Sequence, residues 1–128
     1  MTDLDLAKLN RKMAEKVMGW ISGISKEYPY PQQGGMVWMD STGSEVIYQY
    51  LWTPTTDIVQ TFQVVERMRK LGWHFGMDDY EISGNYEAEF VGNENNKFPS
   101  RTGRADDPAL AICLAAEKAV EAGIEEPT

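Results

Sequence analysis

Apolar side chains recur every three or four positions through residues 3–20, a spacing typical of one face of an amphipathic helix. The recurring residues are Leu6, Leu9, Met13, Val17 and Trp20. Thr2 and Asp5 have the three-residue spacing of a capping box, in which each side chain accepts a hydrogen bond from the other's backbone N–H. We therefore predict a helix over residues 3–20.

The period shortens to two in residues 36–52, which predict a β-hairpin with its turn at residues 40–43. On the second strand this period places Val46, Tyr48, Tyr50 and Trp52 on one face, and Ile47, Gln49 and Leu51 on the other. Both faces carry apolar or aromatic groups. We therefore expect a sheet that is covered on both sides.

A second helical period follows, with Thr55 as the expected N-cap and Gly72 placed to end the helix in a left-handed conformation. Its predicted buried stripe consists of Ile58, Phe62, Val65, Met68 and Leu71. Residues 73–92 return to a two-residue alternation and predict a second hairpin, turning at residues 83–85. A third strand is expected over residues 97–105, broken or bulged near Pro99.

The last helix is predicted from an Asp107 cap and a first-turn Pro108 to about Ala122. The element order is then α-ββ-α-βββ-α, with no internal repeat and no linker long enough to divide the chain. Connections of hairpin length favour an antiparallel sheet, here of about five strands, covered by helices. We expect an α+β fold and a single domain over residues 1–128.

Composition limits the function further. The chain of 128 residues carries a formal charge of -8, so general nucleic-acid binding is not expected. One cysteine, Cys113, excludes an internal disulfide and a multi-cysteine zinc site, and one histidine, His74, excludes a two-imidazole metal site. The N-terminus lacks the pattern of a secretory signal, and no stretch approaches the ~20 apolar residues of a membrane span.

No catalytic signature is present, and we predict neither catalytic residues nor a cofactor. Asp78, Asp79 or Asp106 would bind Mg²⁺ only if the fold brought them together. His74 lies between two aromatic residues and is expected to be a packed or edge residue. Cys113 falls in the middle of the last helix, where an inert buried thiol is expected.

The aromatic residues of the hairpins offer a binding alternative to simple core packing. These residues are Trp38, Tyr48, Tyr50, Trp52 and Trp73. If Tyr48, Tyr50 and Trp52 line an open face, their rings would stack on a planar ligand. Arg101, Thr102 and Arg104 would then hold its phosphates. Because Arg101 and Arg104 are three residues apart on a strand, only a bulge at Gly103 would bring them to one side.

Three segments, "MAEKVMGW", "TDIVQTFQVVERMRKLGW" and "ADDPALAICLAAEKAV", resemble in this order the phage ABA sandwich domain family of phage and prophage proteins. The resemblance extends over nearly the whole chain. It implies an α/β/α layered sandwich, a phage or prophage origin, and hence a place in the cytoplasm of the infected bacterium. It implies no catalytic residues.

Three hypotheses of function follow. The first is a non-enzymatic phage protein that counters bacterial defence by binding and sequestering a nucleotide-type immune signal. The second is an acidic inhibitor that covers a basic surface on a host defence effector or nuclease, a contact that high salt would weaken. The third is an enzyme that degrades such a signal with Asp78, Asp79 or His74. The hairpin aromatics and apolar edges also allow a homo-oligomer.

Overall fold

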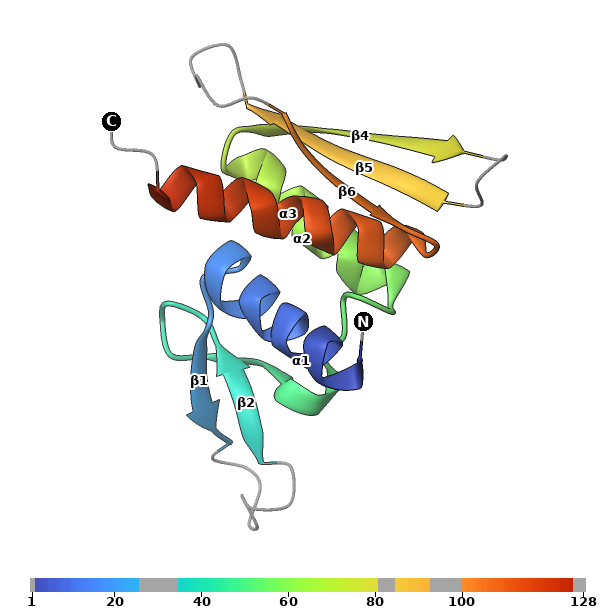
Figure 1. Cartoon of the computed structure of the whole chain (residues 1–128). Coiled ribbons are helices and arrows are strands. Elements are labelled where there is room, and N and C mark those ends of the chain that lie inside the picture. The colour runs from blue at the N-terminus through green and yellow to red at the C-terminus, as the bar shows by residue number, and fades with distance from the viewer. Residues whose placement is uncertain (1, 26–34, 81–84, 93–99, 126–128) are drawn as a thin grey trace.

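In the computed structural model of the chain, helices lie between two antiparallel sheets (Figure 1). The structure describes residues 2–25, 35–80, 85–92 and 100–125. The helices are α1 (Asp3–Lys12), α2 (Ile58–Lys70) and α3 (Pro108–Glu125), with a π-helical turn η1 (Met13–Val17) and a 3-10 turn η3 (Gln49–Leu51). The N-terminal sheet contains β1 (Ile21–Ile24), β2 (Met36–Met39) and β3 (Glu45–Tyr48). The C-terminal sheet contains β4 (Trp73–Tyr80), β5 (Asn85–Gly92) and β6 (Arg101–Ala105).

The α+β class is confirmed, as are both hairpins and the order of the helices. The described strands form two sheets of three rather than one sheet of about five. The first hairpin pairs with β1, a strand that the sequence pattern did not indicate, and not with β4 to β6. The first helix ends earlier than expected. Its final turn is π-helical, and Gly19 adopts a φ of 73° directly after it. This left-handed residue redirects the chain, so that Ile21 to Ile24 pair antiparallel with β2.

The start of α1 follows its prediction closely. Thr2 and Asp5 form the complete capping box, with the Asp5 N–H donating to Thr2 Oγ1 at 3.2 Å and the Thr2 N–H to Asp5 Oδ2 at 3.0 Å.

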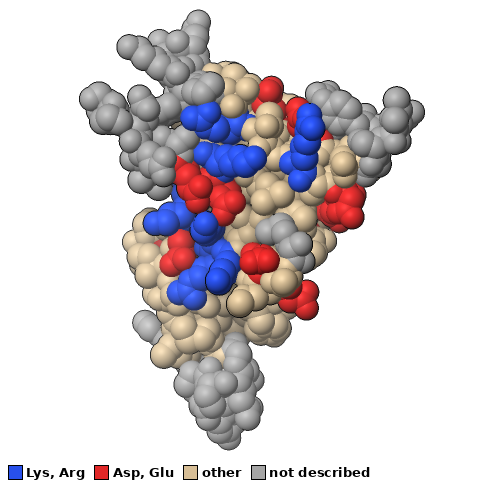
Figure 2. Space-filling model, in the orientation of Figure 1, with Lys and Arg blue, Asp and Glu red and all other residues tan. Residues whose placement is uncertain are grey.

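Ion pairs on the outer side join α1 to α3. The Lys12 ammonium lies 2.8 Å from the Glu117 carboxylate and 3.2 Å from that of Glu121. Figure 2 shows that basic and acidic side chains interleave over the face formed by these two helices.

Helix α2 presents a different face to the core from the one predicted. Asp57, not Thr55, is its N-cap, and the Asp57 carboxylate accepts from the N–H groups of Val59 and Gln60. The buried residues of the helix are Thr61, Val64, Val65 and Met68. Ile58, Phe62 and Leu71 were expected in this stripe and are exposed. The hydrophobic pattern did not include Thr61, because it is a polar residue. Its hydroxyl is bound to the Pro54 carbonyl, which allows Thr61 to be buried and shifts the buried face of the helix toward it.

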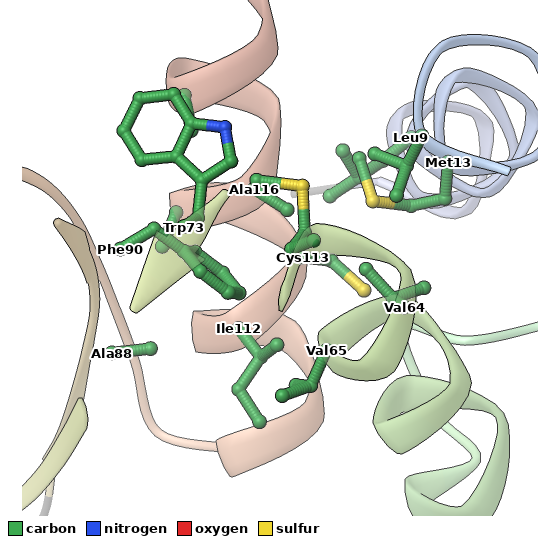
Figure 3. Close-up of a cluster of buried hydrophobic side chains, with 14 of the residues drawn as sticks. Leu9, Met13, Val64, Val65, Trp73, Ala88, Phe90, Ile112, Cys113 and Ala116 are labelled. Atoms are coloured by element: carbon green, nitrogen blue, oxygen red, sulfur yellow. The ribbon is translucent and has the colours of Figure 1, made fainter. Parts of the chain in front are cut away.

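One hydrophobic cluster joins the three helices to the C-terminal sheet (Figure 3). Its labelled members are Leu9 and Met13 from α1, Val64 and Val65 from α2, Ile112, Cys113 and Ala116 from α3, and Trp73, Ala88 and Phe90 from the sheet. Trp38 and Trp52 extend the same cluster toward the N-terminal sheet. Asp107 caps α3 as predicted, accepting from the Ala109 N–H at 2.8 Å and the Leu110 N–H at 3.3 Å.

Candidate functional site

The three aromatic candidates do not share one strand face. The strand β3 ends at Tyr48, and the 3-10 turn that follows breaks the two-residue alternation. As a result Tyr48 is half-buried, Tyr50 is 67% exposed and Trp52 is only 2% exposed. The Tyr48 and Tyr50 rings still lie side by side, with centroids 5.8 Å apart. Trp52 is therefore mainly a core residue, while Tyr50 is available to a ligand.

The candidate phosphate donors on β6 do not converge. The pairing of β5 with β6 is continuous from Phe90–Arg101 to Tyr86–Ala105, so the strand has no bulge at Gly103. Arg101 consequently shares a face with Phe90 and the helices, whereas Thr102 and Arg104 lie on the outer face. Arg104 is bound to Glu87 of the neighbouring strand.

Gly103 serves packing rather than ligand binding. It is buried under α3, and a Cβ at this position would lie 2.5 Å from both the Ala111 carbonyl oxygen and the Ala115 nitrogen. The strand β6 and the aromatic candidates also belong to different sheets on opposite sides of the helices (Figure 1). The predicted site is thus divided, and the aromatic part needs another source of positive charge.

A hollow of about 270 Å³ supplies that charge on the aromatic side. It lies where α1 passes the N-terminal sheet and η3. The residues that line it are Ala7, Asn10, Arg11, Trp38, Gln49, Tyr50, Trp52 and Thr53. Ligand pockets typically span about 300–1,000 Å³, so this hollow lies just below the usual size of a ligand site. It combines Tyr50 and Trp52 of the predicted site with an arginine from α1.

The cation of the hollow is Arg11. The Arg11 guanidinium carbon lies 5.8 Å from the centroid of the Trp38 ring, within the range of a cation–π contact. The Arg11 Nε donates to Glu15 at 3.1 Å, and both side chains are exposed. Among the described residues, the two terminal nitrogens of Arg11 have no hydrogen-bond partner. They are therefore free to donate to an anion.

The wall of the hollow is held by partly buried hydrogen bonds. The Trp52 indole N–H donates to the Asn10 carbonyl oxygen at 3.0 Å, and the Thr55 N–H donates to Asn10 Oδ1 at 3.1 Å. This bond orients the Asn10 amide, and its NH₂ group has no hydrogen-bond partner among the described residues. Gln49 is fixed in the same way, donating to Ser22 Oγ at 2.7 Å and to the Val37 carbonyl at 3.1 Å.

The sequence pattern did not single out Asn10 and Arg11. Ala7, Asn10 and Arg11 nevertheless have the spacing of three and four that places them on one helix face. This second stripe, next to the buried face of the helix, was the sequence signal that could have identified Asn10 and Arg11.

The candidates for catalysis do not form a cluster in the described part of the chain. His74 is exposed on the outer face of β4, opposite Val91. Asp106 is exposed at the start of α3, while the side chains of Asp78 and Asp79 lie outside the described residues. No group of three or more His, Cys, Asp or Glu that could hold a metal occurs among the described residues. Burial raises the pKa of the Cys113 thiol to about 12, so this cysteine is an inert core residue.

Fold and hollow together define a small α+β domain with an aromatic cavity that carries one arginine. No helix within the described residues is long and apolar enough to cross a membrane. Residues 11–116 match the model of the phage ABA sandwich domain, and the chain belongs to this family of phage proteins.

The fold is also similar to a solved structure, the 2.0 Å crystal structure of a phage protein from Bacillus cereus. The TM-score is 0.62 at 16% sequence identity, over 94% of this chain and 92% of the other. At this identity the similarity shows a shared fold. No curated protein sequence matches the chain.

Proposed function

We propose that the protein counters bacterial anti-phage defence by binding a nucleotide-type immune signal in the hollow between α1 and η3 and removing it from circulation. The observation that carries the proposal is the combination in one small hollow of exposed Tyr50 and Arg11, whose guanidinium lies over the buried Trp38 ring. Membership in a family of phage proteins fits such a role. The site of action is then the cytoplasm of the infected bacterium.

In this proposal the base of the nucleotide lies against the exposed ring of Tyr50, because aromatic side chains stack on every base. The Asn10 NH₂ group donates to an acceptor on the base edge. The terminal nitrogens of Arg11 pair with a phosphate through two donors. No bond of the ligand breaks, so a cluster of acids or bases is not needed.

The test is isothermal titration calorimetry of the full chain with cyclic oligonucleotides and ADP-ribose-derived signals. Tyr50→Ala and Arg11→Gln should each weaken binding of the recognised signal by about 10-fold or more, since stacking or a charge-assisted bond contributes about 1–3 kcal/mol. Both side chains are exposed, so the melting temperatures should change little.

Arg104→Gln is the matched control, because it removes an arginine from the far sheet. If this variant lost binding while Arg11→Gln kept it, the site would lie on the C-terminal sheet and the proposal would be wrong. Absence of heat with every signal, in a protein that still protects phage, would also overturn it. Recovery of a chemically altered ligand after denaturing the protein would replace sequestration with degradation.

A further inference from the structure

Two side-chain amides, those of Asn10 and Gln49, line the hollow between α1 and η3. Both side chains are half-buried, and the protein binds only one end of each amide. The bound partners distinguish the oxygen from the nitrogen, because a backbone N–H requires an acceptor and a backbone carbonyl requires a donor. The two amides use opposite ends for these bonds, so the ends left for a ligand differ in chemistry.

Asn10 contributes a donor. Its Oδ1 accepts from the Thr55 N–H at 3.1 Å, which commits the oxygen to the segment that leads into α2. Its NH₂ group is left without a hydrogen-bond partner in the described part of the chain. A ligand in the hollow therefore meets an N–H donor on the α1 side.

Gln49 contributes an acceptor. Its Nε2 donates to Ser22 Oγ at 2.7 Å and to the Val37 carbonyl at 3.1 Å, which uses both of its hydrogens. Its Oε1 accepts no hydrogen bond from the residues that the structure describes. Because both donors are committed to the N-terminal sheet, the amide cannot turn over to serve a ligand carbonyl, and Gln49 offers the ligand an oxygen only.

This pair of groups matches the edge of adenine. The 6-amino group of adenine is a donor, and ring nitrogens that accept lie beside it. The amino group projects beyond the ring, so it meets Gln49 Oε1 without bringing an oxygen toward it. In hypoxanthine a carbonyl oxygen takes the place of the amino group, and two acceptors would then face each other, an arrangement that rejects a ligand.

We propose that the hollow recognises adenine, with Gln49 Oε1 accepting from the 6-amino group and the Asn10 NH₂ group donating to N1. The N1 side lies away from the sugar, so it enters the hollow while the phosphate stays at exposed Arg11. This inference rests on the proposed function, which leaves the base open. Arg11 and Tyr50 bind features that all nucleotides share, whereas Asn10 and Gln49 determine the specificity.

Calorimetry of the full chain with matched ligands tests this recognition. Cyclic di-AMP and ADP-ribose are each compared with the deaminated form, in which hypoxanthine replaces adenine and only the amino group changes. At least one adenine ligand should bind, and its deaminated form should bind about 10-fold more weakly or worse. Equal binding of the two forms would overturn adenine recognition, while the proposed function would stand if Tyr50→Ala and Arg11→Gln weakened both. Failure of both adenine ligands to bind would also overturn this inference, and failure of every nucleotide would overturn the proposed function with it.

Asn10→Asp tests the donor without removing the structural bond, because the carboxylate keeps an oxygen for the Thr55 N–H. The NH₂ group becomes an acceptor that faces N1 of adenine, whereas hypoxanthine carries an N–H at N1. The variant should bind the adenine ligand about 10-fold more weakly, and its preference for adenine over hypoxanthine should shrink or reverse.

Gln63→Glu is the matched control for the added negative charge, since Gln63 is exposed on α2 and does not line the hollow. It should keep the full preference for adenine. A preference that Asn10→Asp leaves unchanged, or that Gln63→Glu reduces equally, would overturn the assignment of Asn10. Melting temperatures of both variants verify that the fold is intact.

Discussion

The two sheets contact the helices in opposite ways. The C-terminal sheet meets α3 through small residues, and at Gly103 the helix backbone lies directly against the strand. The N-terminal sheet meets α1 through large rings, with Trp38 and Trp52 buried between the sheet and the helix. Small residues allow two backbones to approach closely. Large aromatic side chains keep the backbones apart and leave gaps where the rings do not touch.

This difference determines where a ligand can enter. Backbone atoms and alanine side chains pack tightly between α3 and β6, so no space remains there for a ligand. The contact of α1 with the N-terminal sheet leaves the 270 Å³ hollow beside Trp38 and Trp52. We infer that the C-terminal half provides the rigid support of the domain and that the N-terminal half provides its adaptable surface.

The largest effect on this comparison is expected from Trp52→Ala. Trp52 is almost fully buried, packs edge-on against Trp20 at 4.8 Å and donates to the Asn10 carbonyl. Its removal leaves a cavity and should lower the free energy of unfolding by about 3–5 kcal/mol. Urea denaturation measures this loss. In this variant, hydrogen exchange should show that the amides of β1 to β3 exchange before those of β4 to β6. The same order of exchange as in wild type would mean that Trp52 does not hold the N-terminal sheet.

Adding one methyl group to a glycine compares how closely the two halves of the domain pack: Gly103 faces α3, and Gly23 faces Met39 of its own sheet. Gly103→Ala should cost about 2–3 kcal/mol, since the new carbon meets backbone atoms of α3 at 2.5 Å. In the N-terminal sheet, a Cβ at Gly23 would meet the Met39 sulfur at 2.7 Å, a flexible side chain that can move aside. Gly23→Ala should therefore cost less than about 1 kcal/mol.

Gly76→Ala is the control for any general effect of alanine in a strand. Nothing lies within 4 Å of its added Cβ, so this variant should be neutral or slightly stabilising. Urea denaturation of the three variants gives the ranking. Equal losses at Gly103 and Gly23 would show that the two glycine positions are packed equally tightly, contrary to this expectation.

The C-terminal half was the more predictable from sequence. Regular alternation in residues 85–92 and the Asp107–Pro108 cap specify β5 and α3 through local rules, and the structure has both. In the N-terminal half, the π-helical turn and Gly19 redirect the chain into β1, a strand that the hydrophobic pattern did not predict. The 3-10 turn after Tyr48 then separated Tyr50 from Trp52.

The candidate site shows the same limit. Tyr50 and Trp52 were identified from their residue type, but Arg11 reaches them from a helix about 40 positions earlier in the chain. Sequence separation of this kind is set by tertiary packing, which local patterns do not encode. Arg101 and Arg104 were assigned to phosphate binding because they lie only three residues apart in the sequence, but the continuous register of β6 places them on opposite faces.

A smaller effect is expected where the two halves are linked, at the segment that leads from η3 into α2. The Thr61 hydroxyl lies 2.6 Å from the Pro54 carbonyl oxygen and 2.7 Å from that of Asp57. Thr61→Val removes this hydroxyl and should cost about 1–2 kcal/mol in urea denaturation, because the Pro54 carbonyl loses its buried donor, whereas the Asp57 carbonyl still accepts from the Thr61 N–H. The hydroxyl of Thr55, also buried, has no partner among the described residues. Thr55→Val should therefore be neutral or stabilising, and a loss equal to that of Thr61→Val would contradict this assignment.

The smallest effect concerns pH and the turn between β2 and β3. Hydrogen bonds lower the pKa of Asp40, first from the Thr42 hydroxyl at 2.6 Å and then from the Ser44 N–H at 3.0 Å. The folded pKa lies below the unfolded value of about 3.9. The ionised carboxylate therefore stabilises the fold above about pH 4, and this contribution is lost as the pH falls through the folded pKa.

Asp40→Asn should accordingly be less stable than wild type at pH 7, and the difference should shrink as the pH is lowered below 4. Thr42→Ala removes the strongest of these bonds. In this background the stabilities of the Asp40 protein and of Asp40→Asn should become equal at a higher pH, closer to the unfolded pKa. Urea denaturation at several pH values measures both, and exchange of the Ser44 amide locates the change in the N-terminal sheet. A difference that persists unchanged to pH 2 would mean that Asp40 acts through turn geometry rather than charge. The N-terminal half would then owe its acid response to other groups.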